Sequence, residues 1–115
     1  MKKNRIKLLV SFLLCCSLCH AYEFVYGDDT RTGTLFAKDP VVVRHGGRYL
    51  MYYSIPPHDS RKWEGWNIGI AESDDLKGWR RIGEIAPDAD YEAKGLCAPG
   101  AIVRNDTIHL FYQTY

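Results

Sequence analysis

Two stretches of this 115-residue sequence share one pattern, and that internal repeat limits the folds that the chain can adopt. Residues 39–54 align without a gap with residues 98–113, at an offset of 59 residues, as from Pro40 to Pro99. Each copy has a proline, an apolar run, a polar turn and a second run that ends in adjacent aromatic residues. A repeat of this length indicates stacked β-modules or propeller blades, in which each unit buries its apolar face against the next.

Each copy of the repeat predicts a β-hairpin. In the first copy, residues 41–43 are a β-branched run of the kind favoured in strands, and residues 49–54 return as the second strand. The Gly46-Gly47 pair suits the positive φ angles of a tight hairpin turn, and Asn105-Asp106 takes its place in the second copy.

Two further strands are expected between the copies, at residues 66–73 and 79–85, joined by a segment rich in turn formers. Residues 40–85 would then form four antiparallel strands, which is the size and order of one propeller blade. Residues 99–115 would supply the first two strands of a second blade. We therefore expect an all-β fold, a β-propeller of which this chain holds about one and a half blades.

The first 21 residues have the pattern of a secretory signal peptide. A basic segment precedes an apolar core at residues 8–19, which is too short to span a bilayer, and Ala21 ends a small-residue cleavage site. We expect cleavage there, a secreted or periplasmic location and no membrane span. Lipoprotein anchoring through Cys15, Cys16 or Cys19 is the weaker alternative.

The remainder, residues 22–115, carries no excess of basic residues, so no nucleic-acid partner is expected. Cys97 is the one cysteine left in it, which excludes an internal disulfide. The spacing of Cys97 from the histidines matches no zinc-ligand pattern, and we expect no metal site and no cofactor.

Four segments together resemble the five-bladed β-propeller glycosidases, that is, glycoside hydrolase family 43 and its relatives, families 32, 62, 68, 117 and 130. Residues 37–43 and 47–54 are similar to the hairpin that opens the first blade. Residues 68–76, followed by Trp79, are similar to its third strand and turn. Residues 97–112 resemble the "Trp-Ala-Pro" segment that opens the second blade, with Cys97 in place of the tryptophan.

The resemblance covers about residues 36–115. It implies that residues 22–115 are the N-terminal part of a propeller glycosidase domain, with the first blade at about residues 36–85 and the second beginning at about residue 98. A five-bladed propeller needs about 300 residues at this repeat length. We therefore expect the chain to be a fragment of a longer protein whose missing downstream blades complete the fold.

Asp39 is the residue on which the resemblance confers a catalytic role. The family's aspartate at the start of the first innermost strand is the general base in inverting members and the nucleophile in retaining members. The aligned residue of the second copy is Ala98, so the scaffold itself does not need a carboxylate at this position. The alternative is that Asp39 only shapes the turn before Pro40. The resemblance places the general acid in later blades, and the structural calcium of some relatives has no recognisable ligand set here.

Antiparallel strand order predicts which loops lie near Asp39. The start of the first strand shares one end of the sheet with loop 55–65 and with connection 86–98, whereas turn 74–78, with its adjacent aspartates, lies at the opposite end. The first loop offers His58, Trp63 and, directly after it, Trp66 as candidate substrate-binding residues. The alternative for the tryptophans is packing within the blade.

We therefore expect a secreted glycoside hydrolase that acts on poly- or oligosaccharides by carboxylate acid/base catalysis. The 115 residues alone are expected to be inactive, because hydrolysis also needs an acid that protonates the leaving oxygen. The alternatives are a carbohydrate-binding propeller without catalysis and a glycoside phosphorylase.

Overall fold

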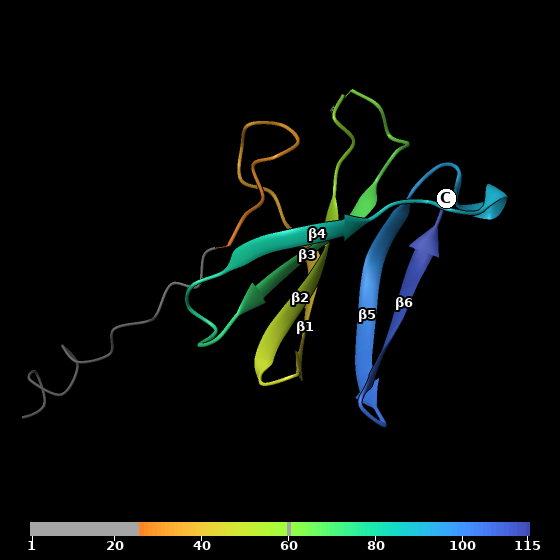
Figure 1. Cartoon of the computed structure of the whole chain (residues 1–115). Helices are drawn as coiled ribbons and strands as arrows, with labels where there is room; N and C mark the ends of the chain where they lie inside the picture. Colours follow the sequence, from red (N-terminus) through yellow and green to blue (C-terminus); the bar gives the residue numbers. More distant parts are fainter. Residues whose placement is uncertain (1–25, 60) are drawn as a thin grey trace, which may run out of the picture.

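The computed structural model describes residues 26–59 and 61–115, and the predicted signal peptide, residues 1–21, lies outside that range. The described residues form antiparallel strands and one short 3-10 turn, so the all-β prediction is confirmed. The elements are β1 (Lys38–His45), β2 (Arg48–Ile55), β3 (Asn67–Ser73), β4 (Arg80–Ile85), η1 (Asp90–Glu92), β5 (Leu96–Arg104) and β6 (Thr107–Thr114). The first four strands make one sheet in the order β1-β2-β3-β4, and β5 pairs with β6 in a second sheet (Figure 1).

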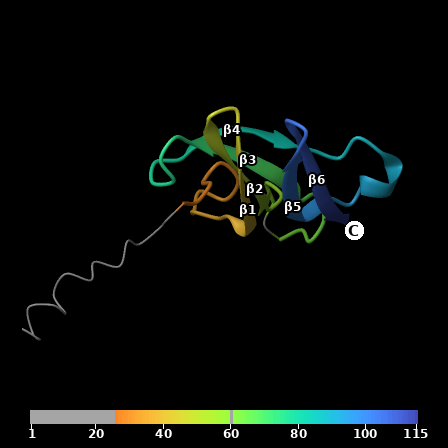
Figure 2. The ribbon, with the colours of Figure 1, turned by 90° about the horizontal axis from the view of Figure 1, so that it is seen from below.

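The four-stranded sheet has an apolar layer on each face. Strand β2 is buried from Leu50 to Ile55, because its alternating side chains reach both layers. The layer toward the second sheet consists of Leu50, Tyr52, Ile68 and Leu96 of β5. The layer on the other face consists of Met51, Tyr53, Ile55 and Ala71, against which Tyr26, Ala37 and Trp79 pack. The sheet is therefore the middle of a three-layer arrangement, with β5 and β6 beside one face (Figure 2).

The second hairpin, β5 and β6, repeats the backbone path of the first, β1 and β2. Each hairpin has a register shift between aligned positions, Lys38/Val41 in β1 and Cys97/Gly100 in β5, where one strand carries an extra residue. Left-handed φ angles recur at the same offset, at Asp39 (51°) and Ala98 (49°), and at Gly46 (59°) and Asn105 (51°). The sequence repeat is thus also a repeat of backbone conformation.

The two hairpins contact one another at both ends. At the turn end, His45 Nε2 lies 3.0 Å from the backbone oxygen of Asp106. Near the other end, the backbone N–H of Ala98 donates to Ser54 Oγ at 2.8 Å. These contacts fix how the start of β5 sits relative to the end of β2.

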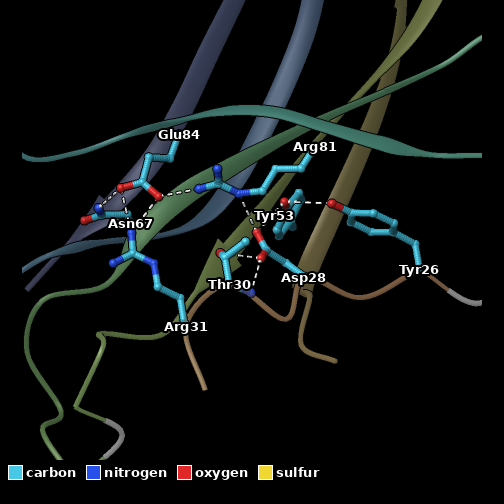
Figure 3. Close-up of polar contacts among 8 residues, drawn as sticks. All are labelled: Tyr26, Asp28, Thr30, Arg31, Tyr53, Asn67, Arg81 and Glu84. Atoms are coloured by element: carbon cyan, nitrogen blue, oxygen red, sulfur yellow. Dashed lines mark hydrogen bonds and ion pairs between the residues drawn. The ribbon is translucent and has the colours of Figure 1, made fainter. Parts of the chain in front are cut away.

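Residues 26–37, here called the N-terminal strap, cover the face of the sheet away from β5. A backbone bridge between Asp28 and Phe36 closes the strap, with N–H to oxygen distances of 3.0 and 3.1 Å. The Asp28 carboxylate is buried and accepts hydrogen bonds from Tyr53 Oη at 2.8 Å and Arg81 Nε at 2.9 Å (Figure 3). The strap is therefore held by polar contacts that join residues 25 and 53 positions apart, which the sequence analysis did not predict.

Candidate functional site

One end of the two sheets, here called the loop end, gathers the longer connections (Figure 1). Backbone hydrogen bonds tie these segments together: Gly65 N–H donates to Lys94 at 2.7 Å, and Leu96 N–H donates to Trp66 at 2.8 Å. Gly95 allows this close approach, because a Cβ there would lie 2.7 Å from Trp66 N and its φ is 129°. The loop end is therefore one connected surface made from both sheets.

Asp39 reaches the loop end through the bulge at the start of β1. Lys38 pairs with Ser54 and Val41 pairs with Tyr52, so β1 has one residue more than β2 in this interval. The φ of 51° at Asp39 is a left-handed conformation that few residues other than glycine adopt. The bulge removes Asp39 from the regular ladder and leaves it exposed to solvent. A bulge that re-aims a side chain in this way is common beside active sites.

Trp63 and Tyr115, here called the aromatic wall, lie at the loop end, as Asp39 does. Their rings meet edge to face with centroids 6.0 Å apart, and the residues are 60% and 51% exposed. The Lys94 ammonium lies 5.4 Å from the centroid of the Trp63 ring. Contact with the Cys97 side chain, burial and the negative charge of Asp39 together raise the pKa of the Tyr115 phenol. Tyr115 directly follows β6, whose pairing with β5 returns it to the end of the sheets where β1 starts, so Asp39 and the aromatic wall lie at the same end.

Trp66 lies at the same end but is packed rather than free. Its ring meets Phe36 of the strap edge to face at 5.8 Å, and the Lys38 ammonium lies 5.9 Å from its centroid. The residue is half-buried. The structure thus places the Trp66 ring beside Phe36 and the Lys38 side chain, and this packing agrees with the alternative that it stabilises the blade.

His58 occupies a different part of the loop end. It is exposed and lines a hollow of about 440 Å³ together with residues of the strap, the 56–65 loop and the 86–95 connection. Arg31 also lines this hollow, and its guanidinium donates to Glu84 of β4 at 2.6 Å. Asp39, Trp63 and Trp66 do not line the hollow. The structure thus places His58 in a hollow whose lining also includes Lys62 and Glu64, the neighbours of Trp63 in the chain.

Two other acidic residues, Asp75 and Glu92, have structural partners. Asp75 accepts hydrogen bonds from the backbone N–H groups of Lys77 and Gly78 in the turn away from the loop end. Glu92 is buried and accepts from Tyr112 Oη at 2.6 Å. In the described part of the chain, no cluster of three or more His, Cys, Asp or Glu side chains is placed to hold a metal ion. The same residues include no helix of the length and apolarity that crossing a membrane requires.

The sequence analysis missed Tyr115 and Lys94 as members of the site. The one available signal was topological: Lys94 belongs to the connection predicted to share the end with Asp39. Tyr115 directly follows β6, whose antiparallel pairing with β5 carries it back to the same end. Contact of both residues with Trp63 depends on the packing of loops, which no local pattern encodes.

Comparison with known proteins gives one match. The family described as "Glycosyl hydrolases family 32 N-terminal domain" matches residues 32–115. No curated protein and no solved structure matches the chain. The matched family is one of the relatives of family 43 named with the resemblance, and the match shows family 32 and not family 43 itself.

Proposed function

Because the chain belongs to the family of glycosyl hydrolase family 32 N-terminal domains, a β-propeller family, we propose that it contributes Asp39 to the hydrolysis of a glycosidic bond in an oligo- or polysaccharide. The observation that carries this assignment is the bulge that leaves Asp39 exposed at the same end of the sheets as the aromatic wall. The second hairpin supports it, since Ala98 adopts the same φ without a carboxylate. The bulge therefore does not require an acidic side chain for its own stability.

The chemistry follows from the position of Asp39 at the aromatic wall. The wall offers exposed ring faces and edges against which the apolar face of a sugar ring packs. In our proposal, the Asp39 carboxylate either removes a proton from the attacking water or attacks the anomeric carbon itself, through an oxocarbenium-like transition state. The distance between Asp39 and the general acid decides between these routes.

The general acid comes, in our proposal, from a later blade of the propeller. The 115 residues alone then bind sugar without turnover, because the leaving oxygen receives no proton. We also propose that residues 1–21 act as a signal peptide that directs export of the protein, as their composition indicates. A mass measurement of the secreted natural protein tests that point, and an N-terminus at Met1 would contradict it.

The test of the catalytic assignment compares two aspartate variants of the natural protein on a panel of aryl glycosides. Asp39→Asn is expected to lower kcat/KM by about 10³-fold, as removal of a catalytic carboxylate does. Asp74→Asn is the matched control, since Asp74 is exposed in the turn away from the loop end and is expected to retain full activity. Equal activity of Asp39→Asn and the wild type would overturn the assignment.

A carbohydrate-binding role without catalysis is the second candidate, and the exposure of the aromatic wall favours it. Titration of the natural protein with oligosaccharides separates the two candidates. Binding that Trp63→Ala abolishes, with no hydrolysis on any substrate of the panel and no phosphorolysis when phosphate is added, would establish the binding role instead.

A further inference from the structure

Ser54 is a fully buried polar residue at the end of β2, on the face that meets the second hairpin. It is 0% exposed, and its hydroxyl oxygen accepts the backbone N–H of Ala98 at 2.8 Å. Its backbone pairs with Lys38, the residue immediately before Asp39. Ser54 therefore contacts both repeats at the points where their bulges begin.

The N–H of Ala98 needs such a partner. The bulge between Cys97 and Gly100 takes Ala98 out of the β5–β6 ladder, so the ladder offers this N–H no acceptor. A buried backbone N–H without an acceptor is costly, and Pro99, the next residue, has no N–H of its own. Ser54 supplies the missing acceptor from the neighbouring sheet.

This hydrogen bond connects the two parts of the site. On one side, Ser54 pairs in the ladder beside the bulge of Asp39. On the other side, Ala98 lies near the start of β5, and the N–H of Tyr115 donates to the backbone oxygen of Gly95, just before that strand, at 3.4 Å. The Ser54–Ala98 bond thus links the ladder beside Asp39 to the hairpin that ends at the aromatic wall, although Ser54 is buried and does not face the surface.

We propose that Ser54 is a positioning residue that holds Asp39 and the aromatic wall at the separation that the substrate requires. The proposal rests on the function proposed above. Displacement of a reacting group by about 1 Å can cost up to about 100-fold in rate. Loss of the Ser54 hydroxyl is therefore expected to lower kcat/KM even when the protein remains folded.

The experiment uses the natural protein and two matched serine variants. Ser54→Ala removes the acceptor and leaves Cβ in place. Ser73→Ala is the control, because Ser73 is 4% exposed in the same sheet and its Oγ accepts the backbone N–H of Leu76 at 2.9 Å, away from the loop end. Both variants lose a buried side-chain acceptor, but only Ser54→Ala loses a hydrogen bond between the two hairpins.

The expected result has two parts. Hydrogen exchange at the Ala98 amide becomes faster in Ser54→Ala, and kcat/KM per folded molecule falls about tenfold, whereas Ser73→Ala keeps the wild-type kcat/KM. Faster exchange at Ala98 with unchanged kcat/KM would show that Ser54 is merely structural, and would overturn the proposal. Should Ser54→Ala not fold, Ser54→Cys keeps the volume with a weaker acceptor. Its kcat/KM is expected between those of wild type and Asp39→Asn, and a wild-type value would equally overturn the proposal.

The same assay includes Asp39→Asn. If that variant is as active as the wild type, the proposed function fails, whatever the result at Ser54. If Asp39→Asn is inactive and Ser54→Ala is fully active, only the role of Ser54 fails.

Discussion

The two hairpins of this chain follow the same backbone path in different surroundings. In the first hairpin, β2 is buried between two apolar layers, one of which the N-terminal strap completes. In the second hairpin, the strands β5 and β6 leave Ile102 (52%) and Phe111 (60%) exposed. The bulge and the left-handed turn are nevertheless the same in both. Their conformation is therefore a property of the repeat and does not depend on the packing around it.

The comparison also isolates what is particular to the first hairpin. At the aligned bulge position one copy has Asp39 and the other has Ala98, with φ angles of 51° and 49°. Alanine thus tolerates the conformation in the second hairpin. Asp39→Ala is therefore expected to preserve the bulge of the first hairpin. The backbone conformation of the bulge therefore does not depend on a carboxylate at this position.

The largest change in the free energy of unfolding is expected from a substitution in the four-stranded sheet, one face of which the strap covers. A Cβ on Gly69 of β3 would lie 2.4 Å from the ring of Tyr53, which is fully buried. Gly69→Ala is expected to lower the free energy of unfolding by about 3 kcal/mol, since the ring cannot move without disturbing its layer. Urea denaturation measures the change.

Gly100 of the second hairpin is the matched control, because nothing lies within 4 Å of a Cβ there. Gly100→Ala is expected to change stability by less than about 0.5 kcal/mol. Similar stabilities of the two variants would contradict the difference in packing between the two hairpins.

The strap makes the first sheet sensitive to acid. Burial acts to raise the pKa of Asp28, but the hydrogen bonds from Thr30, Tyr53 and Arg81 outweigh it, so the pKa falls below its usual value of 3.8. A carboxyl group with a lowered folded-state pKa stabilises the protein above its unfolded pKa, and this contribution is lost as the pH falls through the folded value.

Asp28→Asn is therefore expected to destabilise the protein at pH 6 by about 2 kcal/mol and to lose less stability than the wild type between pH 6 and pH 3. Urea denaturation at the two pH values checks this expectation. The same pH dependence in both proteins would mean that the strap is not held by the Asp28 carboxylate.

The smallest change in the free energy of unfolding is expected from exchanging the residue types at one aligned position of the two turns. Gly46 and Asn105 occupy aligned turn positions with φ of 59° and 51°. Gly46→Asn and Asn105→Gly are each expected to change the free energy of unfolding by less than about 1 kcal/mol, because asparagine and glycine both tolerate this region. Thermal unfolding of each variant measures the change. A loss above about 2 kcal/mol in either one would show that the two turns are not equivalent.

The strands were predictable from the sequence because their signals are local. Alternating burial, β-branched runs and glycine turns act within a few residues, and antiparallel order then assigned Asp39 and turn 74–78 to opposite ends. The bulge at Asp39 was not predicted, although the aligned prolines mark both copies of it. Its left-handed φ results from the register with β2, which the local sequence does not specify.

The side-chain partners were less predictable than the strands. The bonds of Asp28 with Tyr53 and Arg81 join residues 25 and 53 positions apart, and they exist only after the strap folds over the sheet. In the same way, Trp63 meets Tyr115 only where two loop segments pack together. His58, which the sequence grouped with Trp63, lines a hollow that residues of the strap and of the 86–95 connection also line, and this grouping arises only from the folded loops.

The most direct test of the central claim replaces the carboxylate with a small external anion. In the natural protein, Asp39→Ala is expected to keep the bulge, as Ala98 does, and to lose hydrolysis of an activated aryl glycoside. Sodium azide is then expected to restore release of the aryl group by at least about tenfold and to yield a glycosyl azide, because azide reaches the anomeric carbon through the space that the carboxylate leaves. A folded Asp39→Ala protein that hydrolyses the substrate as the wild type does, or that azide does not reactivate, would contradict the claim that Asp39 acts at the reacting carbon.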